Sequence, residues 1–225
     1  MMKSKQSAIN GLTGGIEYLF KKNGVTYVKG WGKFASPTEI AVDLNAGGTE
    51  TISAKNIIIA TGSEPNSLPA STGLGTDEKY VVSSTGGLSL EKIPKKMIVV
   101  GGGVIGLEPG SVYQRLGTEV TVVQHTERVC QFVDKEVGLS FQNILKKQGM
   151  KFLLNHRVVD GVNNKEKGVS INLTNDKGEK ITVDCDVALI SIGRHAFTGG
   201  LQLEKAGLTA DKRGVIPTND HWQTS

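Results

Sequence analysis

The chain has 225 residues, of which 38% are apolar and 21% charged, so it is long enough for one large or two modest globular domains with cores of their own. Its 26 basic and 22 acidic side chains give a formal charge of +4 without a dense Lys or Arg run, which excludes a nucleic-acid-binding tract and favours anionic ligands only weakly. No apolar run approaches the roughly 20 residues that span a bilayer, and the N-terminal stretch MMKSKQSAIN lacks the apolar core of a signal peptide. We therefore expect no membrane segment and see no targeting segment.

The first 92 residues predict only part of a domain. Apolar residues at helical spacing between Ile9 and Phe20 predict an opening helix. A strand is expected over 25–30, short strands follow, and the apolar run at 55–60 predicts a buried strand. No glycine-rich βαβ unit precedes that run to supply its neighbours, so we expect an incomplete domain with an open apolar face.

From Met97 onward, apolar strands alternate with segments of helical period, which indicates an α/β fold. Parallel strands joined by helices cross over right-handed and align their carboxyl ends along one edge of the sheet. We expect one nucleotide-binding domain over residues 93–215, with residues 216–225 returning to the first domain. Its expected elements are strands at 97–100, 119–123 and 151–154, helices at about 104–116 and 134–148, an antiparallel excursion at 169–185, and a strand buried on both faces at 187–193.

Gly101, Gly103 and Gly106 form the pattern G-x-G-x-x-G between the first of these strands and its helix. In a dinucleotide-binding loop the first glycine permits a tight turn, the second lets the backbone approach a pyrophosphate, and the third lets helix and strand pack closely. The amino end of the following helix then offers N–H groups to the phosphates. Because strand, loop, helix and second strand occur in the required order, the sequence predicts a dinucleotide site.

Two residues depart from this pattern. A carboxylate at the end of the second strand would accept hydrogen bonds from both ribose hydroxyls, but the chain has Gln124, a loss of about 1 kcal/mol. Gln124 also lacks the charge that repels a 2′-phosphate, and Arg128 is close enough in sequence to approach such a group. Pro109 lies inside the expected helix, where proline is unfavourable by about 3 kcal/mol. The helix either begins near Val104 and passes Pro109, which we favour, or begins late with Pro109 in its first turn.

The two cysteines predict no redox pair and no metal site. Cys130 and Cys185 are 55 positions apart, and Cys185 alternates with Ile181 and Val183 as a buried strand thiol would. We expect Cys130 to be inert. The four histidines are expected on the surface, and they are His125, His156, His195 and His221.

Segments along the whole chain resemble the dihydrolipoyl dehydrogenases, the flavoprotein E3 components of 2-oxo-acid dehydrogenase complexes, within the pyridine nucleotide-disulfide oxidoreductases. The resemblance rests on NIIIATGSEP, VVSSTGGLSLEKIPKKMIVVGGGVIGLE, ILKKQGMKF, DVALISIGR and FTGGLQLEKAGL. It implies a Rossmann-like NAD-binding domain and an incomplete FAD-binding domain, the latter over residues 1–92. One departure is His195-Ala196, which replaces the Arg-Pro usual after SIGR.

The resemblance also implies which residues contact the two cofactors. For FAD these are Gly32, Thr61, Gly62 and Ser63. For NAD they are Gly101, Gly102, Gly103, Val104, Ile105, Gly106, Leu107 and Glu108, with Gln124 at the ribose position, Val158 and Gly193.

The implied activity is oxidation of dihydrolipoamide, carried on lipoyl domains, with electrons passing through FAD to NAD. A homodimer is implied, located in the mitochondrial matrix of a eukaryote or otherwise in the cytoplasm. The redox disulfide, the first βαβ unit, the dimerisation domain and the catalytic His-Glu pair lie outside the matching segments. We therefore expect no catalytic residue in these 225 residues and an inactive isolated chain. A non-catalytic NAD-binding module and a fragment or pseudogene product that binds nothing stably remain alternatives.

Overall fold

The computed structural model describes residues 1–225, which divide into two compact units. One unit comprises residues 1–63 and 195–225, and the other comprises residues 64–194. The chain passes from one unit to the other within the paired strands β4 (Ser63–Pro65) and β13 (Arg194–Ala196). No helix combines the length and the apolar character that a membrane crossing needs.

The unit of residues 64–194 is built on a five-stranded parallel sheet in the order β5-β12-β6-β7-β8. Its strands are β5 (Val81–Val82), β6 (Lys96–Val100), β7 (Glu119–Gln124), β8 (Lys151–Leu154) and β12 (Val187–Ile190). All four residues of β12 are buried, as expected of a central parallel strand that is covered on both faces. The carboxyl ends of β6, β7 and β12 consequently lie side by side.

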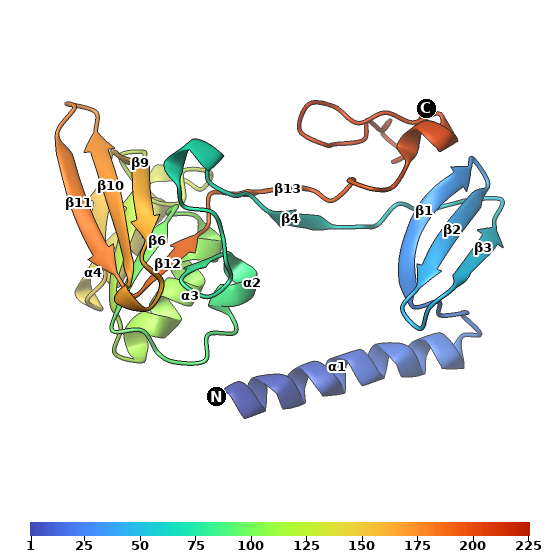
Figure 1. The fold of residues 1–225 in the computed structure, drawn as a ribbon, viewed down its shortest axis with the longest axis horizontal. Coiled ribbons are helices and arrows are strands. Elements are labelled where there is room, and N and C mark those ends of the chain that lie inside the picture. Colours follow the sequence, from blue (N-terminus) through green and yellow to red (C-terminus); the bar gives the residue numbers. More distant parts are fainter. The chain divides into compact units, whose positions relative to one another are not determined.

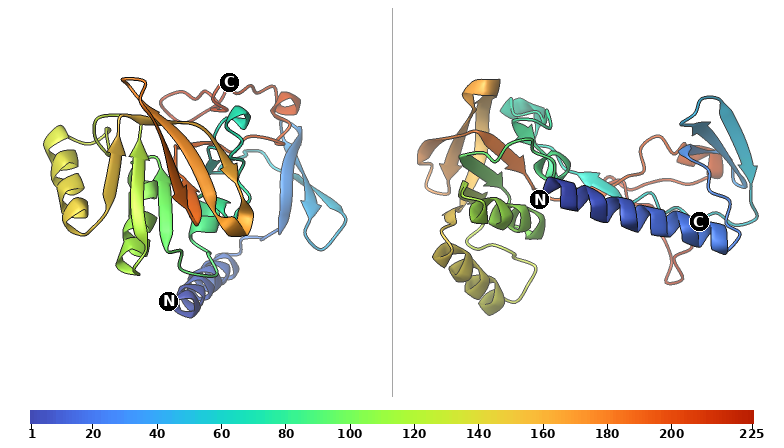
Figure 2. Two further views of the ribbon diagram at one scale, coloured as in Figure 1. Left: turned by 60° about the vertical axis from the view of Figure 1, so that its left-hand side comes forward. Right: turned by 90° about the horizontal axis from the view of Figure 1, so that it is seen from below.

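Helices cover one face of this sheet, and a three-stranded antiparallel sheet covers the other (Figures 1 and 2). The helices are α2 (Ser84–Gly87), α3 (Val104–Arg115) and α4 (Lys135–Lys147), and the antiparallel strands are β9 (His156–Asn163), β10 (Val169–Asn175) and β11 (Lys180–Cys185). Alternation along β6 separates two cores, because Met97 and Val99 pack with Leu107 of α3, whereas Ile98 and Val100 pack with Ile171 of β10.

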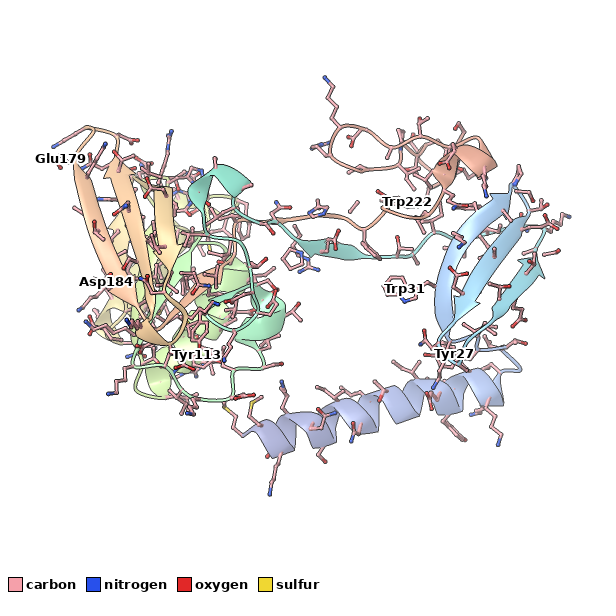
Figure 3. The ribbon with its side chains drawn as sticks, viewed as in Figure 1. Tyr27, Trp31, Tyr113, Glu179, Asp184 and Trp222 are labelled. Atoms are coloured by element: carbon pink, nitrogen blue, oxygen red, sulfur yellow. The ribbon has the colours of Figure 1, made fainter.

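The unit of residues 1–63 and 195–225 contains α1 (Met2–Lys22) and an antiparallel sheet of β1 (Gly30–Ser36), β2 (Glu39–Leu44) and β3 (Thr49–Ser53). No residue of α1 is buried. Near its end, Glu17 pairs with Lys29 at 2.7 Å, and the Phe20 and Tyr27 rings lie 5.3 Å apart, with Tyr27 labelled in Figure 3. Three short 3-10 helices complete the chain, at Ala70–Thr72, Lys165–Lys167 and Leu203–Ala206.

The structure confirms the α/β fold and the expected helix at the N-terminus, but two predicted strands are wrong. Regular β structure begins only at Gly30, so no strand covers 25–29. Residues 55–62 form no strand either, and the side chain of Ile58 is 89% exposed. A strand needs a partner to pair its backbone N–H and C=O groups, and no neighbouring strand flanks this apolar run.

The two compact units do not coincide with the predicted domain limits of 92/93 and 215/216. Residues 64–92 belong with the parallel sheet, because Val81 and Val82 form its edge strand and Leu74 is buried in its core. Residues 195–225 belong with the β1–β3 unit, where the Phe34 N–H donates to the Leu201 carbonyl at 2.9 Å. The assignment of cofactor-binding domains along the chain remains a prediction.

Both cysteines are free and buried. Cys185 ends β11, which confirms the expected buried strand thiol, and burial raises its pKa to about 12. Burial also raises the pKa of Cys130, an effect that the nearby Arg128 charge opposes. The two thiols lie in different cores, on opposite faces of the parallel sheet, and cannot form a disulfide with each other.

Candidate functional site

A cavity of about 460 Å³ opens at the carboxyl ends of β6, β7 and β12, where open α/β sheets bind their ligands. All of its lining residues belong to the unit of residues 64–194. They are Pro65, Ser84, Gly101, Gly102, Gly103, Val104, Ile105, Gln124, His125, Phe132, Ile190, Ser191, Ile192, Gly193 and Arg194. No Asp or Glu lines the cavity, so its wall contains no carboxylate that would repel an anionic ligand.

The three glycines of the loop serve different structural needs. Gly101 has φ +109°, and a Cβ placed on it would lie 2.3 Å from the Ser191 carbonyl oxygen. A Cβ on Gly106 would lie 2.4 Å from the Gly101 carbonyl oxygen and 2.8 Å from the Val99 side chain. Gly103 differs, because its φ of −84° suits any residue and a Cβ there would meet nothing within 4 Å. Gly101 and Gly106 are therefore required by packing, whereas Gly103 faces the open cavity.

Helix α3 begins beside the cavity, at Val104. Its N-cap residue is Gly103, which has no side chain to accept a hydrogen bond from the first N–H groups of the helix. The Leu107 N–H already donates to the Gly103 carbonyl at 3.1 Å, so the helical turn is formed ahead of Pro109. Of the two alternatives for Pro109, the structure has the early start with proline inside the helix, which leaves the positive end of α3 at the cavity.

Gln124 ends β7 and is only 8% exposed. Its Oε1 accepts a hydrogen bond of 2.8 Å from the Gly102 N–H, and its Nε2 donates to the Thr126 hydroxyl at 2.6 Å. The side chain therefore fastens the glycine loop to β7 in addition to lining the cavity.

Arg128 does not take the position expected for a 2′-phosphate ligand. Its guanidinium donates to the carbonyls of Cys130, Gln131 and Val133 at 3.0–3.3 Å. The expectation came from closeness in sequence, but the left-handed turn at Cys130, with φ +46°, brings three carbonyls around this side chain. Arg128 organises the loop after β7 instead.

The structure brings only part of the predicted NAD set together. Gly101, Gly102, Gly103, Val104, Ile105, Gln124 and Gly193 line the cavity. Of the others, Gly106 and Leu107 are buried in the α3 packing, and Glu108 is exposed on α3. Val158 lies in β9 and packs against the core beneath the antiparallel sheet, not at the cavity wall.

The predicted FAD residues all lie in the other unit, and Ser63, at the limit of that unit, begins β4. Gly32 lies in β1 opposite Val42. The Thr61 hydroxyl donates to the Phe197 carbonyl at 2.5 Å, and the Phe197 N–H donates to the Gly62 carbonyl at 3.0 Å. These bonds hold the Thr61-Gly62 backbone in a defined position without regular secondary structure.

Eight cavity residues were not predicted from the sequence, and they are Pro65, Ser84, His125, Phe132, Ile190, Ser191, Ile192 and Arg194. Ile190, Ser191 and Ile192 follow the buried strand β12, and their position at its carboxyl end is a signal that could have identified them. His125 is exposed, as expected, but it also lines the cavity directly after Gln124. Phe132 lines the cavity from the loop before α4, and nothing in its sequence context marks it.

Comparison with known proteins relates nearly the whole chain to one family. Residues 2–225 match the family model described as pyridine nucleotide-disulphide oxidoreductase. The chain is 50% identical to a mitochondrial dihydrolipoyl dehydrogenase of Pisum sativum and 46% identical to one of Homo sapiens, in each case over 100% of this chain and 44% of the relative. It therefore spans less than half the length of these curated relatives.

The fold is shared with larger solved structures. The chain superimposes on the HOCl-induced flavoprotein disulfide reductase RclA of Escherichia coli, in its Cu(II) complex, with a TM-score of 0.83 and 24% identity. This match covers 99% of the chain and 49% of that structure.

Proposed function

This chain belongs to the pyridine nucleotide-disulphide oxidoreductase family, and on that premise we propose that its residues 64–194 bind NAD as part of a dihydrolipoyl dehydrogenase. The observation that carries the proposal is the glycine loop between β6 and α3. There, Gly103 leaves open space and the uncapped amino end of α3 adjoins a cavity without carboxylates. A pyrophosphate is a doubly charged anion of the kind that such a helix end binds.

The residues present fit NAD in distinct roles. The N–H groups at the start of α3 would bind the pyrophosphate, while Gly101 and Gly106 hold the loop against Ser191 and Val99. Gln124 and His125 would face the adenosine side, because β7 lies on one side of β6, and Ile190 to Arg194 would face the nicotinamide side, because β12 lies on the other. When bound, NAD supplies the acceptor for a hydride.

The wider activity extends the same proposal. In it, Gly32, Thr61, Gly62 and Ser63 contribute to an FAD site that these residues do not complete, and dihydrolipoamide on lipoyl domains is the reductant. We propose a homodimeric enzyme that serves 2-oxo-acid dehydrogenase complexes, in the mitochondrial matrix if the source is eukaryotic, as the names of the plant and human relatives suggest.

A second candidate function is NAD binding without catalysis by these 225 residues alone. It is favoured by the state of the two cysteines, which are buried, free and on opposite faces of the parallel sheet. Burial raises the pKa of both thiols, which suppresses the thiolate that disulfide exchange requires. Neither cysteine can therefore serve as the redox pair that dihydrolipoamide oxidation needs.

The cofactor preference can be tested at Gln124. A glutamate there could still accept the Gly102 N–H, and the Thr126 hydroxyl could donate to it by giving up its present bond of 3.0 Å to the Arg128 carbonyl. We expect Gln124→Glu to tighten NAD about fivefold, since a charged acceptor contributes about 1 kcal/mol more than a neutral one. It should weaken NADP, because the new charge repels the 2′-phosphate. Calorimetric titration of the wild type and the variant with both nucleotides measures the change.

Gln131→Glu is the matched control, since it adds the same charge to an exposed residue of the loop that does not line the cavity. It should leave the ratio of NAD to NADP affinity near that of the wild type. If Gln124→Glu and Gln131→Glu changed the ratio equally, the end of β7 would not be the ribose site.

A further inference from the structure

The loop between β7 and α4 presents one large apolar side chain to solvent at the cavity. The side chain of Phe132 is 72% exposed, although it lines the cavity together with Gln124 and His125. Its neighbours in the loop behave differently, because Val129 and Cys130 are buried in the core under the helices and Val133 packs against that core. Phe132 is the exposed apolar side chain of this part of the loop.

The backbone on both sides of Phe132 is held in place. The Arg128 guanidinium donates to the carbonyls of Cys130 and Gln131 before it and of Val133 after it. The Cys130 N–H donates to the Gly102 carbonyl at 2.9 Å, which ties the loop to the glycine loop itself. Beyond it, the Asp134 carboxylate accepts from the Glu136 and Val137 N–H groups and starts α4. The exposure of Phe132 is thus imposed by a fixed loop and does not come from a flexible tip.

The position of Phe132 determines which nucleoside of a bound dinucleotide it can contact. Gly101 to Gly103 and the start of α3 follow β6, the residues after β12 line the cavity on one side of them, and Gln124, His125 and Phe132 line it on the β7 side. A ligand whose pyrophosphate lies at the start of α3 therefore extends one of its two nucleosides toward Phe132. Because Gln124 occupies the ribose position at the end of β7, that nucleoside is the adenosine.

The ring has no aromatic partner within the chain, since the close ring pairs join Phe20 with Tyr27 and Trp31 with Phe197. An exposed flat apolar ring that lines a nucleotide cavity offers a surface on which an adenine stacks well. Stacking is compatible with the carboxylate-free wall seen here, because it needs no charged acceptor.

We propose that Phe132 is the stacking platform for the adenine of the bound dinucleotide, positioned by the Arg128 contacts with the loop backbone. This inference rests on the proposed NAD site. Stacking then replaces part of the adenosine binding that a carboxylate in place of Gln124 would provide.

The test uses ADP-ribose, which contains the adenosine and pyrophosphate but no nicotinamide, and isothermal titration calorimetry on the full chain. Phe132→Ala should raise the Kd for ADP-ribose and for NAD at least about fivefold, a change typical of losing one stacked base. Phe132→Tyr, which keeps the ring, should remain within about twofold of the wild type. Phe141→Ala is the matched control, since Phe141 is 39% exposed on α4 and does not line the cavity.

A second readout identifies the contact directly. With phenylalanine-labelled protein and AMP as the probe, we expect nuclear Overhauser effects between the adenine protons and one phenylalanine ring, lost in Phe132→Leu. If the wild type bound ADP-ribose and Phe132→Ala bound it equally well, this inference alone would be overturned. A wild type that bound neither ADP-ribose nor NAD would overturn the proposed function together with it.

Discussion

Gly101→Ala should unfold the glycine loop and lower the stability of the unit of residues 64–194 by on the order of 4 kcal/mol. Backbone strain and a steric clash both contribute to this loss of stability. At φ +109° a residue with a Cβ is strained, and that Cβ would lie 2.3 Å from the Ser191 carbonyl oxygen, which is backbone and cannot rotate away. In a thermal melt the loss corresponds to about 10 °C. NAD binding should disappear with the loop.

Gly103→Ala is the control for Gly101→Ala, because it adds the same methyl group two residues away. Its φ of −84° is ordinary and a Cβ there meets nothing within 4 Å, so only the weaker N-cap preference of alanine counts, and the melting temperature should fall by no more than about 3 °C. Equal melting temperatures for Gly101→Ala and the wild type would mean that the loop has a different backbone conformation from the one described.

Pro109→Ala should stabilise the chain by up to about 3 kcal/mol. Pro109 lies inside α3, which runs from Val104 to Arg115, and it has no N–H to donate to the Ile105 carbonyl. Alanine restores that donor and removes the ring that crowds the preceding turn. The melting temperature should rise by several degrees, while the Kd for NAD should change less than about threefold, because the start of α3 is already formed.

Val112→Ala is the control in the same helix, since Val112 is 36% exposed and no proline is removed. Its gain in stability comes from helix propensity alone and should be less than about 1 kcal/mol. A Pro109→Ala variant that bound NAD ten times more tightly with an unchanged melting temperature would contradict the early start of α3.

The parallel sheet and its helices could be predicted from the sequence because each element carries its own local pattern. The strand β12 is apolar throughout, and β6 is apolar from Met97 to Val100. Helix α4 has an Asp134 cap and helical period, and the glycine pattern lies between a strand and a helix. Even the passage of α3 through Pro109 followed from this pattern, because the packing of Gly106 on Val99 holds the first turn in place.

The features that could not be predicted depend on partners distant in the chain or on an unusual backbone conformation. The apolar run at 55–60 has strand composition, but a strand forms only where another strand accepts its hydrogen bonds. The hydrogen bond between Gln124 and Gly102 joins residues 22 positions apart. The three carbonyls around Arg128 depend on the left-handed backbone of Cys130, a conformation that is usual for glycine and is not expected of a cysteine. The outward position of Phe132 follows from those same bonds.

The most direct measurement of the central claim, that the glycine loop of residues 64–194 binds NAD, is calorimetric titration of the wild type and of Gly103→Ala with NAD. The wild type should bind one NAD per chain. Gly103→Ala should bind NAD at least about tenfold more weakly, with a melting temperature within about 3 °C of the wild type, because its methyl group fills the space that the pyrophosphate needs. Gly199→Ala, which also adds a methyl group in open space but outside the cavity, should bind as the wild type does. A wild type without measurable NAD binding, or a Gly103→Ala variant with wild-type affinity, would contradict the account.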